Sequence, residues 1–191
     1  MHASNKMKLY VRYFLLGLLT LSPAFCRAES EVVTHIFATL AGASKIAFSK
    51  YNGVGAANKV GTTDEVVYTC GTSSAVFGMD HVYGTIISLT MPNSTSVVTT
   101  SPVIEELTQV TLYFYPSNEK REGVKVYLSA DGSSWGEALS GEQIEYDKGV
   151  ITAHMPRGNY YIKLANTAAS PVSVYEIRYQ LDHCACFLYV P

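Results

Sequence analysis

The feature that most constrains this chain is a period-two alternation of apolar and polar side chains in its second half. In the segment QVTLYFY (109–115), Val110, Leu112 and Phe114 occupy every second position, with Thr or Tyr between them. The same alternation recurs in VKVYL, YYIKLAN and VSVYEIRYQL. Successive side chains of a β-strand point to opposite faces, so the pattern predicts strands with one buried and one solvated face.

The alternation also assigns individual side chains to a face. In VSVYEIRYQL it predicts that Tyr175, Ile177 and Tyr179 face inward, whereas Glu176 and Arg178 face outward. The tetrapeptide PRGN (156–159) separates the runs GVITAHM and YYIKLAN, and its Pro and Gly predict a turn between two strands.

Shorter β-like runs occupy the first half of the chain. They are rich in Val, Ile, Thr and Tyr and are separated by clusters of Gly, Asn, Ser and Pro. They lie at residues 31–40, 44–50, 66–70, 84–91 and 97–107. About ten strands in one domain, with turns every 8–12 residues, predict an all-β fold of the sandwich or jelly-roll type.

The N-terminus has the pattern of a secretory signal peptide. Three basic residues precede an apolar run at 13–21, which is too short to span a membrane comfortably. Cleavage after Ala28 would leave small residues at positions −3 and −1. We therefore expect residues 1–28 to be a cleaved signal peptide and residues 29–191 to be one β-sandwich domain.

Such a leader places the mature protein outside the cytoplasm, secreted or held in the periplasm or at the cell surface. Lipidation at Cys26 is not expected, because the bulky Phe25 directly precedes it. The rest of the sequence contains no other apolar run of membrane-spanning length.

Cleavage changes the charge of the protein. The signal segment contains four of the 14 basic residues and none of the 16 acidic ones, which leaves a formal charge of −6 on residues 29–191. A surface without a basic excess is a poor partner for polyanions, so we expect no nucleic-acid binding.

Three cysteines remain in the mature sequence, at positions 70, 184 and 186. An oxidising compartment favours a disulfide, and Cys70 with Cys184 or Cys186 is the reasonable pair, because Cys184 and Cys186 are too close in a strand to bond to each other. The other interpretation, three buried reduced thiols, stays open.

The segment VKVYLSADGSSW (124–135) resembles a strand and turn of galactose-binding-like jelly rolls, the discoidin and carbohydrate-binding-module type. Ser129, Asp131, Gly132 and Trp135 have the spacing seen there. The segments at 100–116, 158–166 and 172–181 resemble the strands around it, and the likeness covers about residues 97–182, roughly half the chain. It implies a jelly-roll fold and a binding function, and such folds often hold a structural calcium ion through turn carbonyls and an acid.

Trp135 is the first candidate ligand-binding residue. An exposed indole stacks on sugar rings, and Asp131 in the same turn offers a polar group. Alternatively, the turn at Asp131 and Gly132 only closes a hairpin and the indole packs on the edge of the sandwich.

Aromatic side chains supply the other candidates. Tyr113, Tyr127 and Tyr161 fall on outward positions, where neighbouring strands can align them into a strip for a glycan or a protein. They are equally well explained as ordinary residues on the solvated face of strands. Tyr51 and Asn52, in a glycine-rich loop, form a further candidate site.

The sequence identifies no catalytic centre or cofactor motif. Asp80 and His81 are adjacent and point to opposite sides of a strand, and the cysteines near His183 are too closely spaced for a zinc site. We therefore expect a secreted, non-catalytic module that binds carbohydrate or a cell-surface glycan. The alternatives are an adhesive surface protein that binds other proteins, and a small glycan-active hydrolase or lyase.

Overall fold

The computed structural model describes residues 26–37, 66–70, 76–79, 87–92, 94–117 and 119–186. The chain divides into two compact units, Met1–Glu29 with His183–Pro191, and Ser30–Asp182. Of the first unit, only the strand residues 26–29 and 183–186 are described. Within the described ranges, no helix is long and apolar enough to cross a membrane.

The described residues form ten β-strands and one short 3-10 helix. The strands are β1 (Cys26–Ile36), β2 (Val67–Cys70), β3 (Val76–Met79), β4 (Ile87–Met91), β5 (Val97–Ser101), β6 (Ile104–Tyr115), β7 (Val124–Ser129), β8 (Ile144–Asp147), β9 (Val150–Asn166) and β10 (Val172–Cys186), and the helix η1 spans Gly141–Gln143. The prediction of an all-β fold with about ten strands is confirmed.

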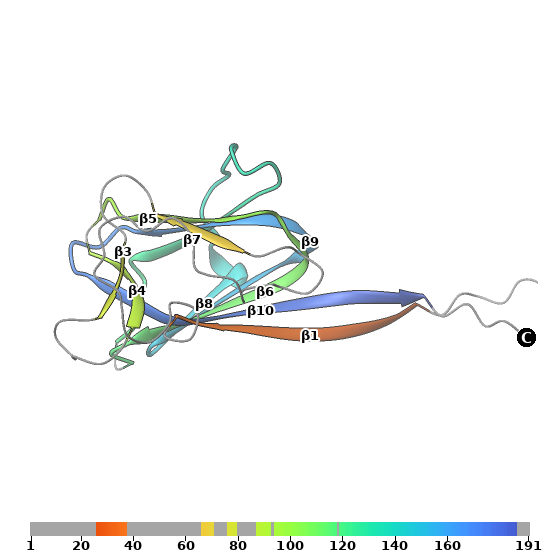
Figure 1. Ribbon diagram of the computed structural model, residues 1–191, viewed down its shortest axis with the longest axis horizontal. Helices are drawn as coiled ribbons and strands as arrows, with labels where there is room; N and C mark the ends of the chain where they lie inside the picture. Colours follow the sequence, from red (N-terminus) through yellow and green to blue (C-terminus); the bar gives the residue numbers. More distant parts are fainter. Residues whose placement is uncertain are drawn as a thin grey trace, which may run out of the picture. The chain divides into compact units, whose positions relative to one another are not determined.

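All strand pairs with a described register are antiparallel, and they join into one curled sheet in the order β2-β5-β9-β6-β10-β4-β3. Strand β1 pairs with β10, while β7 and β8 both pair with β9. The sheet folds over at β9 into two layers (Figure 1). We call β2, β5, β7 and the second part of β9 the β7 layer, and β6, β8, β10, β4, β3, β1 and the first part of β9 the β6 layer.

Strand β9 belongs to both layers because it changes partners along its length. Its first residues, Val150–Ala153, pair with β8 on one side and with β6 on the other. Its last residues, 161–166, pair with β7, and residues 163–165 pair with β5 on the opposite edge. The predicted turn at PRGN (156–159) is therefore wrong. The chain passes through these residues as a continuous strand, because β6 bends alongside them through register shifts near Leu107.

Polar contacts hold β6 and β9 together at this bend. The Arg157 guanidinium forms an ion pair with the Glu106 carboxylate. The backbone N–H of Glu106, whose φ is 55°, donates to Asn159 Oδ1 at 3.1 Å. Tyr160 Oη donates to the carbonyl oxygen of Pro156 at 3.0 Å. The first two contacts link β6 to β9, and the third lies within β9; the Glu106 N–H and the Pro156 carbonyl thereby gain side-chain partners at the bend.

The inner faces of the two layers enclose an apolar core, and the alternation predicted for most strands is confirmed. Fully buried side chains include Leu112, Phe114, Ile151 and Ile162. Tyr175 departs from the prediction: it is half-buried, whereas Glu176 is nearly buried. A bulge in β10 between Val174 and Glu176 shifts the register and brings Tyr175 onto the outer face, which interrupts the period of two.

A buried polar chain joins the two layers inside the core. The Tyr68 hydroxyl, from β2, is hydrogen-bonded to the Tyr179 hydroxyl of β10 at 2.7 Å and to His35 Nδ1 of β1 at 2.5 Å. The three side chains are almost inaccessible to water, and the His35 ring packs edge-on against Tyr179 with centroids 5.1 Å apart. Each hydroxyl thus has a partner that offsets its desolvation.

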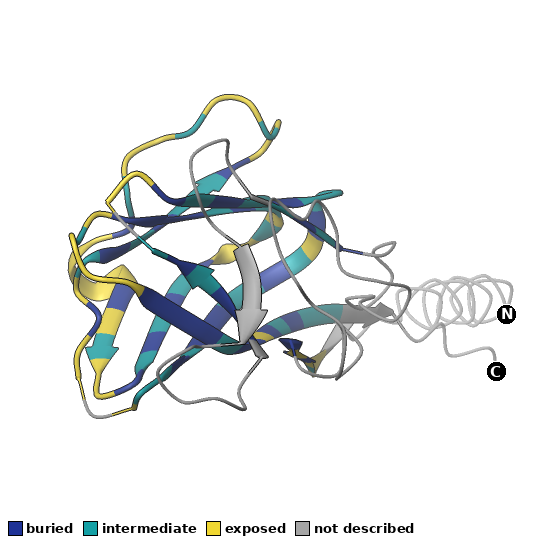
Figure 2. Cartoon of the chain, turned by 60° about the vertical axis from the view of Figure 1, so that its left-hand side comes forward, coloured by how far each residue is buried: buried dark blue, intermediate teal, exposed yellow. Residues whose placement is uncertain are grey.

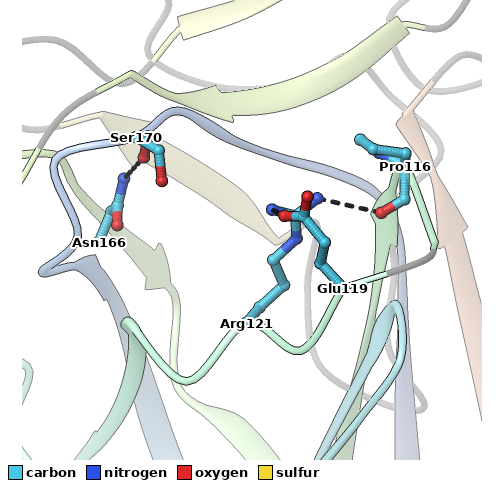
Figure 3. A network of polar contacts seen from close by, with 5 residues as sticks. All are labelled: Pro116, Glu119, Arg121, Asn166 and Ser170. Atoms are coloured by element: carbon cyan, nitrogen blue, oxygen red, sulfur yellow. Dashed lines mark hydrogen bonds and ion pairs between the residues drawn. The ribbon is translucent and has the colours of Figure 1, made fainter.

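Two side chains stabilise the connections at the end of the layers (Figure 3). Arg121 is 8% exposed and donates to Glu119 Oε2 at 2.9 Å and to the carbonyl oxygen of Pro116 at 3.0 Å. Buried Asn166, at the end of β9, donates through Nδ2 to the carbonyl oxygens of Met91 and Ser170, both at 3.0 Å. The amide and the guanidinium therefore anchor the loops before β7 and after β9 to the neighbouring backbone.

The buried hydroxyls predict a loss of stability at alkaline pH. Burial raises the pKa of Tyr68 and of Tyr179 above the ordinary value of 10.0 in the folded protein. Above pH 10 the unfolded chain therefore releases protons that the folded chain keeps, and the free energy of unfolding falls as the pH rises. Urea unfolding between pH 8 and pH 11 should show this decline. In Tyr179→Phe, the slope of the free energy of unfolding against pH should be smaller by up to about 1.4 kcal/mol per pH unit.

Tyr179→Phe should also cost about 1–2 kcal/mol at pH 8, because Tyr68 loses a hydrogen-bond partner. If the free energy of unfolding declined equally steeply with pH in the wild type and in Tyr179→Phe, the raised pKa of Tyr179 would be contradicted.

Candidate functional site

The loop that follows β7 is organised by Ser129 and Asp131. Ser129 Oγ accepts from the backbone N–H of Gly132 at 2.9 Å and donates to Asp131 Oδ1 at 2.9 Å. Asp131 Oδ1 also accepts from the backbone N–H groups of Ser133 and Ser134, at 2.8 and 2.7 Å. These backbone N–H bonds lower the pKa of the Asp131 carboxyl. The Ser-x-Asp-Gly pattern therefore builds a defined turn.

Gly132 lets this turn approach the sheet. Its φ is +73°, in the left-handed region that glycine adopts without strain. A Cβ atom at this position would lie 3.2 Å from Cδ1 of Tyr161, whose ring lies against the glycine. Tyr161 faces outward from β9 directly opposite Ser129. The turn is thus seated on the outer face of the β7 layer by an aromatic ring.

Lys163 lies beside two further aromatic rings on the same face. Its ammonium nitrogen is 4.2 Å from the centroid of the Tyr127 ring and 4.9 Å from that of the Trp135 ring. Tyr127 is the cross-strand partner of Lys163, whereas Trp135 reaches it from the loop. A cation over an aromatic face gains about 0.5–1 kcal/mol at exposed sites, so this lysine helps to fix both rings.

We call Tyr127, Trp135, Tyr161 and Lys163 the aromatic–lysine surface. All four side chains are half-buried, which leaves part of each accessible to a ligand. The loop that carries Trp135 projects from the β7 layer (Figure 1) and is mostly exposed (Figure 2). Trp135 is consequently not a member of the buried core, and a rigid antiparallel sheet supports the other three residues.

A separate aromatic cluster occupies the outer face of the β6 layer. Arg178 lies over the Tyr113 ring, 4.6 Å from its centroid, and its Nε donates to Glu176 Oε1 at 2.6 Å. The rings of Tyr113 and Tyr175 have centroids 6.3 Å apart. Burial raises the pKa of Tyr175, and the hydrogen bond to Glu176 raises the pKa of Arg178. Because Glu176 neutralises Arg178, this cluster presents no net charge.

The structure brings together four of the candidate residues that the sequence predicts. Trp135, Asp131, Tyr127 and Tyr161 lie in or beside the turn after β7. Tyr113 lies on the outer face of the other layer, away from them.

Other predicted residues cannot be placed. Tyr51 and Asn52 lie outside the described residues. The predicted disulfide of Cys70 with Cys184 or Cys186 involves side chains that also lie outside the described set.

The sequence-based candidates omit four residues of these clusters, namely Lys163, Tyr175, Glu176 and Arg178. The alternation in YYIKLAN places Lys163 on the same outward face as Tyr161, and a cation two residues from an outward aromatic side chain is a usable signal. Its approach to Trp135 depends on the path of the loop, which the sequence does not reveal. Tyr175 was assigned to the core, and only the bulge in β10 places it beside Tyr113.

The aromatic–lysine surface offers ring faces, hydroxyl groups and one ammonium group. These groups can stack on a ligand and hydrogen-bond to it, and none of them is a nucleophile activated by a neighbouring base. Within the part of the chain that the structure describes, no group of three or more His, Cys, Asp or Glu side chains could hold a metal ion.

Comparisons with known proteins identify no family. No protein-family model matches the sequence, and no curated protein matches it either. Among solved structures, one similar chain comes from work on the Ruminococcus flavefaciens cellulosome and its expansion in glycan recognition. It shares 14% sequence identity, with 80% of this chain and 97% of that chain covered, at a TM-score of 0.37. A likeness this weak supports no inference about the site.

We expect alanine to have different effects at Gly132 and Gly136, two glycines of the same loop. Gly132→Ala should destabilise the protein by about 1–2 kcal/mol, because it forces a side chain into the left-handed region and against Tyr161. Gly136→Ala is the matched control, because no heavy atom lies within 4 Å of the added Cβ.

Urea unfolding measures both variants, and the fluorescence of the single tryptophan, Trp135, reports on the loop. We expect an altered emission spectrum for Gly132→Ala and a smaller stability change for Gly136→Ala. Equal stability losses in the two variants would show that the turn does not need Gly132.

Proposed function

We propose that this chain is an exported, non-catalytic binding module of the galactose-binding-like jelly-roll type, and that it binds carbohydrate through the aromatic–lysine surface. The supporting observation is the convergence of Tyr127 and Trp135 on Lys163, beside Tyr161, on a solvated sheet face. Sugar rings have apolar C–H faces that pack on aromatic rings and hydroxyl groups that need polar partners. This surface offers both kinds of contact side by side.

The rigidity of the surface favours binding. Tyr127, Tyr161 and Lys163 project from paired strands, and the hydrogen bonds of Ser129 and Asp131 hold the loop that carries Trp135. A ligand that binds to groups already in place loses less free energy to side-chain ordering. Asp131 in this proposal positions the loop, because its Oδ1 accepts hydrogen bonds from two backbone N–H groups and from the Ser129 hydroxyl.

Substitution of the aromatic residues tests the proposal. The purified protein without residues 1–28 is screened on a glycan array, and hits are titrated while the fluorescence of Trp135 is followed. We expect Trp135→Ala and Tyr127→Ala to weaken binding at least tenfold, about 1.4 kcal/mol, because each removes a ring that stacks on the sugar. For Trp135→Ala, which lacks the fluorophore, calorimetry replaces fluorescence.

Tyr113→Ala is the matched control, since it removes a tyrosine with a cation over its ring from the other layer. It should bind as the wild type does. Loss of binding in Tyr113→Ala with retention in Trp135→Ala would move the site to the β6 layer. Failure of the folded wild type to bind any glycan would overturn the proposal.

A further inference from the structure

Lys163 differs from the well-paired cations of the described residues. Arg121, Arg157 and Arg178 each form an ion pair with a glutamate. Lys163 takes part in none of the ion pairs found among the described residues, although its ammonium group is held over two aromatic rings. Ring faces attract the positive charge but accept none of its N–H groups as strongly as an anionic oxygen would.

The surroundings of Lys163 leave the positive charge uncompensated. Its directly paired cross-strand neighbours, Tyr127 and Thr99, are uncharged, and Lys125, two residues from Tyr127 on the same face of β7, is a second cation. The acidic residues of the adjacent loop are Asp131 and Glu137, and neither forms an ion pair with Lys163. Asp131 instead accepts hydrogen bonds from the turn through Oδ1.

We infer that the ligand of the aromatic–lysine surface is an acidic carbohydrate, whose carboxylate or sulfate group pairs with Lys163 while the sugar ring packs on Trp135 or Tyr127. This inference rests on the proposed function, and it adds the charge of the ligand. A charge-assisted bond between an ammonium and an anionic oxygen is stronger than a bond to a neutral hydroxyl.

Because of the overall negative charge of the protein, a preference for acidic polymers would identify a local cation as its cause. Residues 29–191 have a formal charge of −6, so the protein as a whole repels polyanions. A preference for an acidic over a neutral polymer must then arise from a local cation. Lys163 is the ammonium that lies beside the accessible rings of Tyr127 and Trp135.

The test compares three polymers: polygalacturonate, which carries carboxylates, dextran sulfate, which carries sulfate esters, and neutral dextran. We expect the wild type to bind at least one of the two acidic polymers at least tenfold more tightly than dextran. Lys163→Met, which keeps an apolar side chain of similar length, should weaken binding to that polymer about tenfold. Lys163→Arg keeps the charge and should retain most of the affinity.

Lys148→Met is the control. Lys148 is an exposed lysine between β8 and β9 in the β6 layer, away from the aromatic–lysine surface. Its substitution removes the same charge and should leave binding unchanged. Urea unfolding of every variant is measured first, and if Lys163→Met does not fold, Lys163→Gln replaces it.

The outcomes separate the two proposals. Equal binding of dextran and the acidic polymers, unaffected by Lys163→Met but lost in Trp135→Ala, would overturn the acidic ligand and leave carbohydrate binding standing. Equal losses in Lys163→Met and Lys148→Met would indicate a general charge effect and would also overturn it. No binding of any polymer, together with no hit on the glycan array, would overturn both.

Discussion

The structure depends on one strand, β9, being hydrogen-bonded in both layers. Its first part pairs with β6 and β8, and its second part pairs with β5 and β7. A strand that changes partners on both edges needs a bend, and the bulges of β6 and the Arg157–Glu106 ion pair accommodate that bend. Because the layers are joined through β9, their inner faces meet and their outer faces point apart.

The same strand determines the position of the candidate binding surface. Ile162 and Leu164 point into the core, so Tyr161 and Lys163, which alternate with them along β9, lie on its outer face. The antiparallel register then sets Tyr127 opposite Lys163 and Ser129 opposite Tyr161. The turn that begins at Ser129 consequently starts above Tyr161, and the loop carries Trp135 back over the lysine. The core and the proposed binding surface thus use alternate residues of one strand.

The two clusters of aromatic and cationic residues differ in charge although they look alike in sequence. In the β6 layer, Glu176 and Arg178 lie two residues apart on the outer face of β10, and the carboxylate neutralises the guanidinium. In the β7 layer, Lys163 faces Tyr127 and Thr99, and its charge remains available. The two surfaces therefore differ in chemistry, because Arg178 is ion-paired whereas Lys163 takes part in none of the ion pairs found among the described residues.

The sequence by itself determined the all-β fold, the faces of most strands and the turn at Asp131 and Gly132, because a period of two and a local hydrogen-bonding pattern depend only on nearby residues. It identified Trp135, Tyr127 and Tyr161 as candidates but could not assemble them. Tertiary structure decided three features: the passage of β9 through PRGN, the outward position of Tyr175, and the contact of Lys163 with Trp135. Each depends on which strand lies alongside, and long-range pairing overrides the local preference of a Pro-Gly segment or an alternating run.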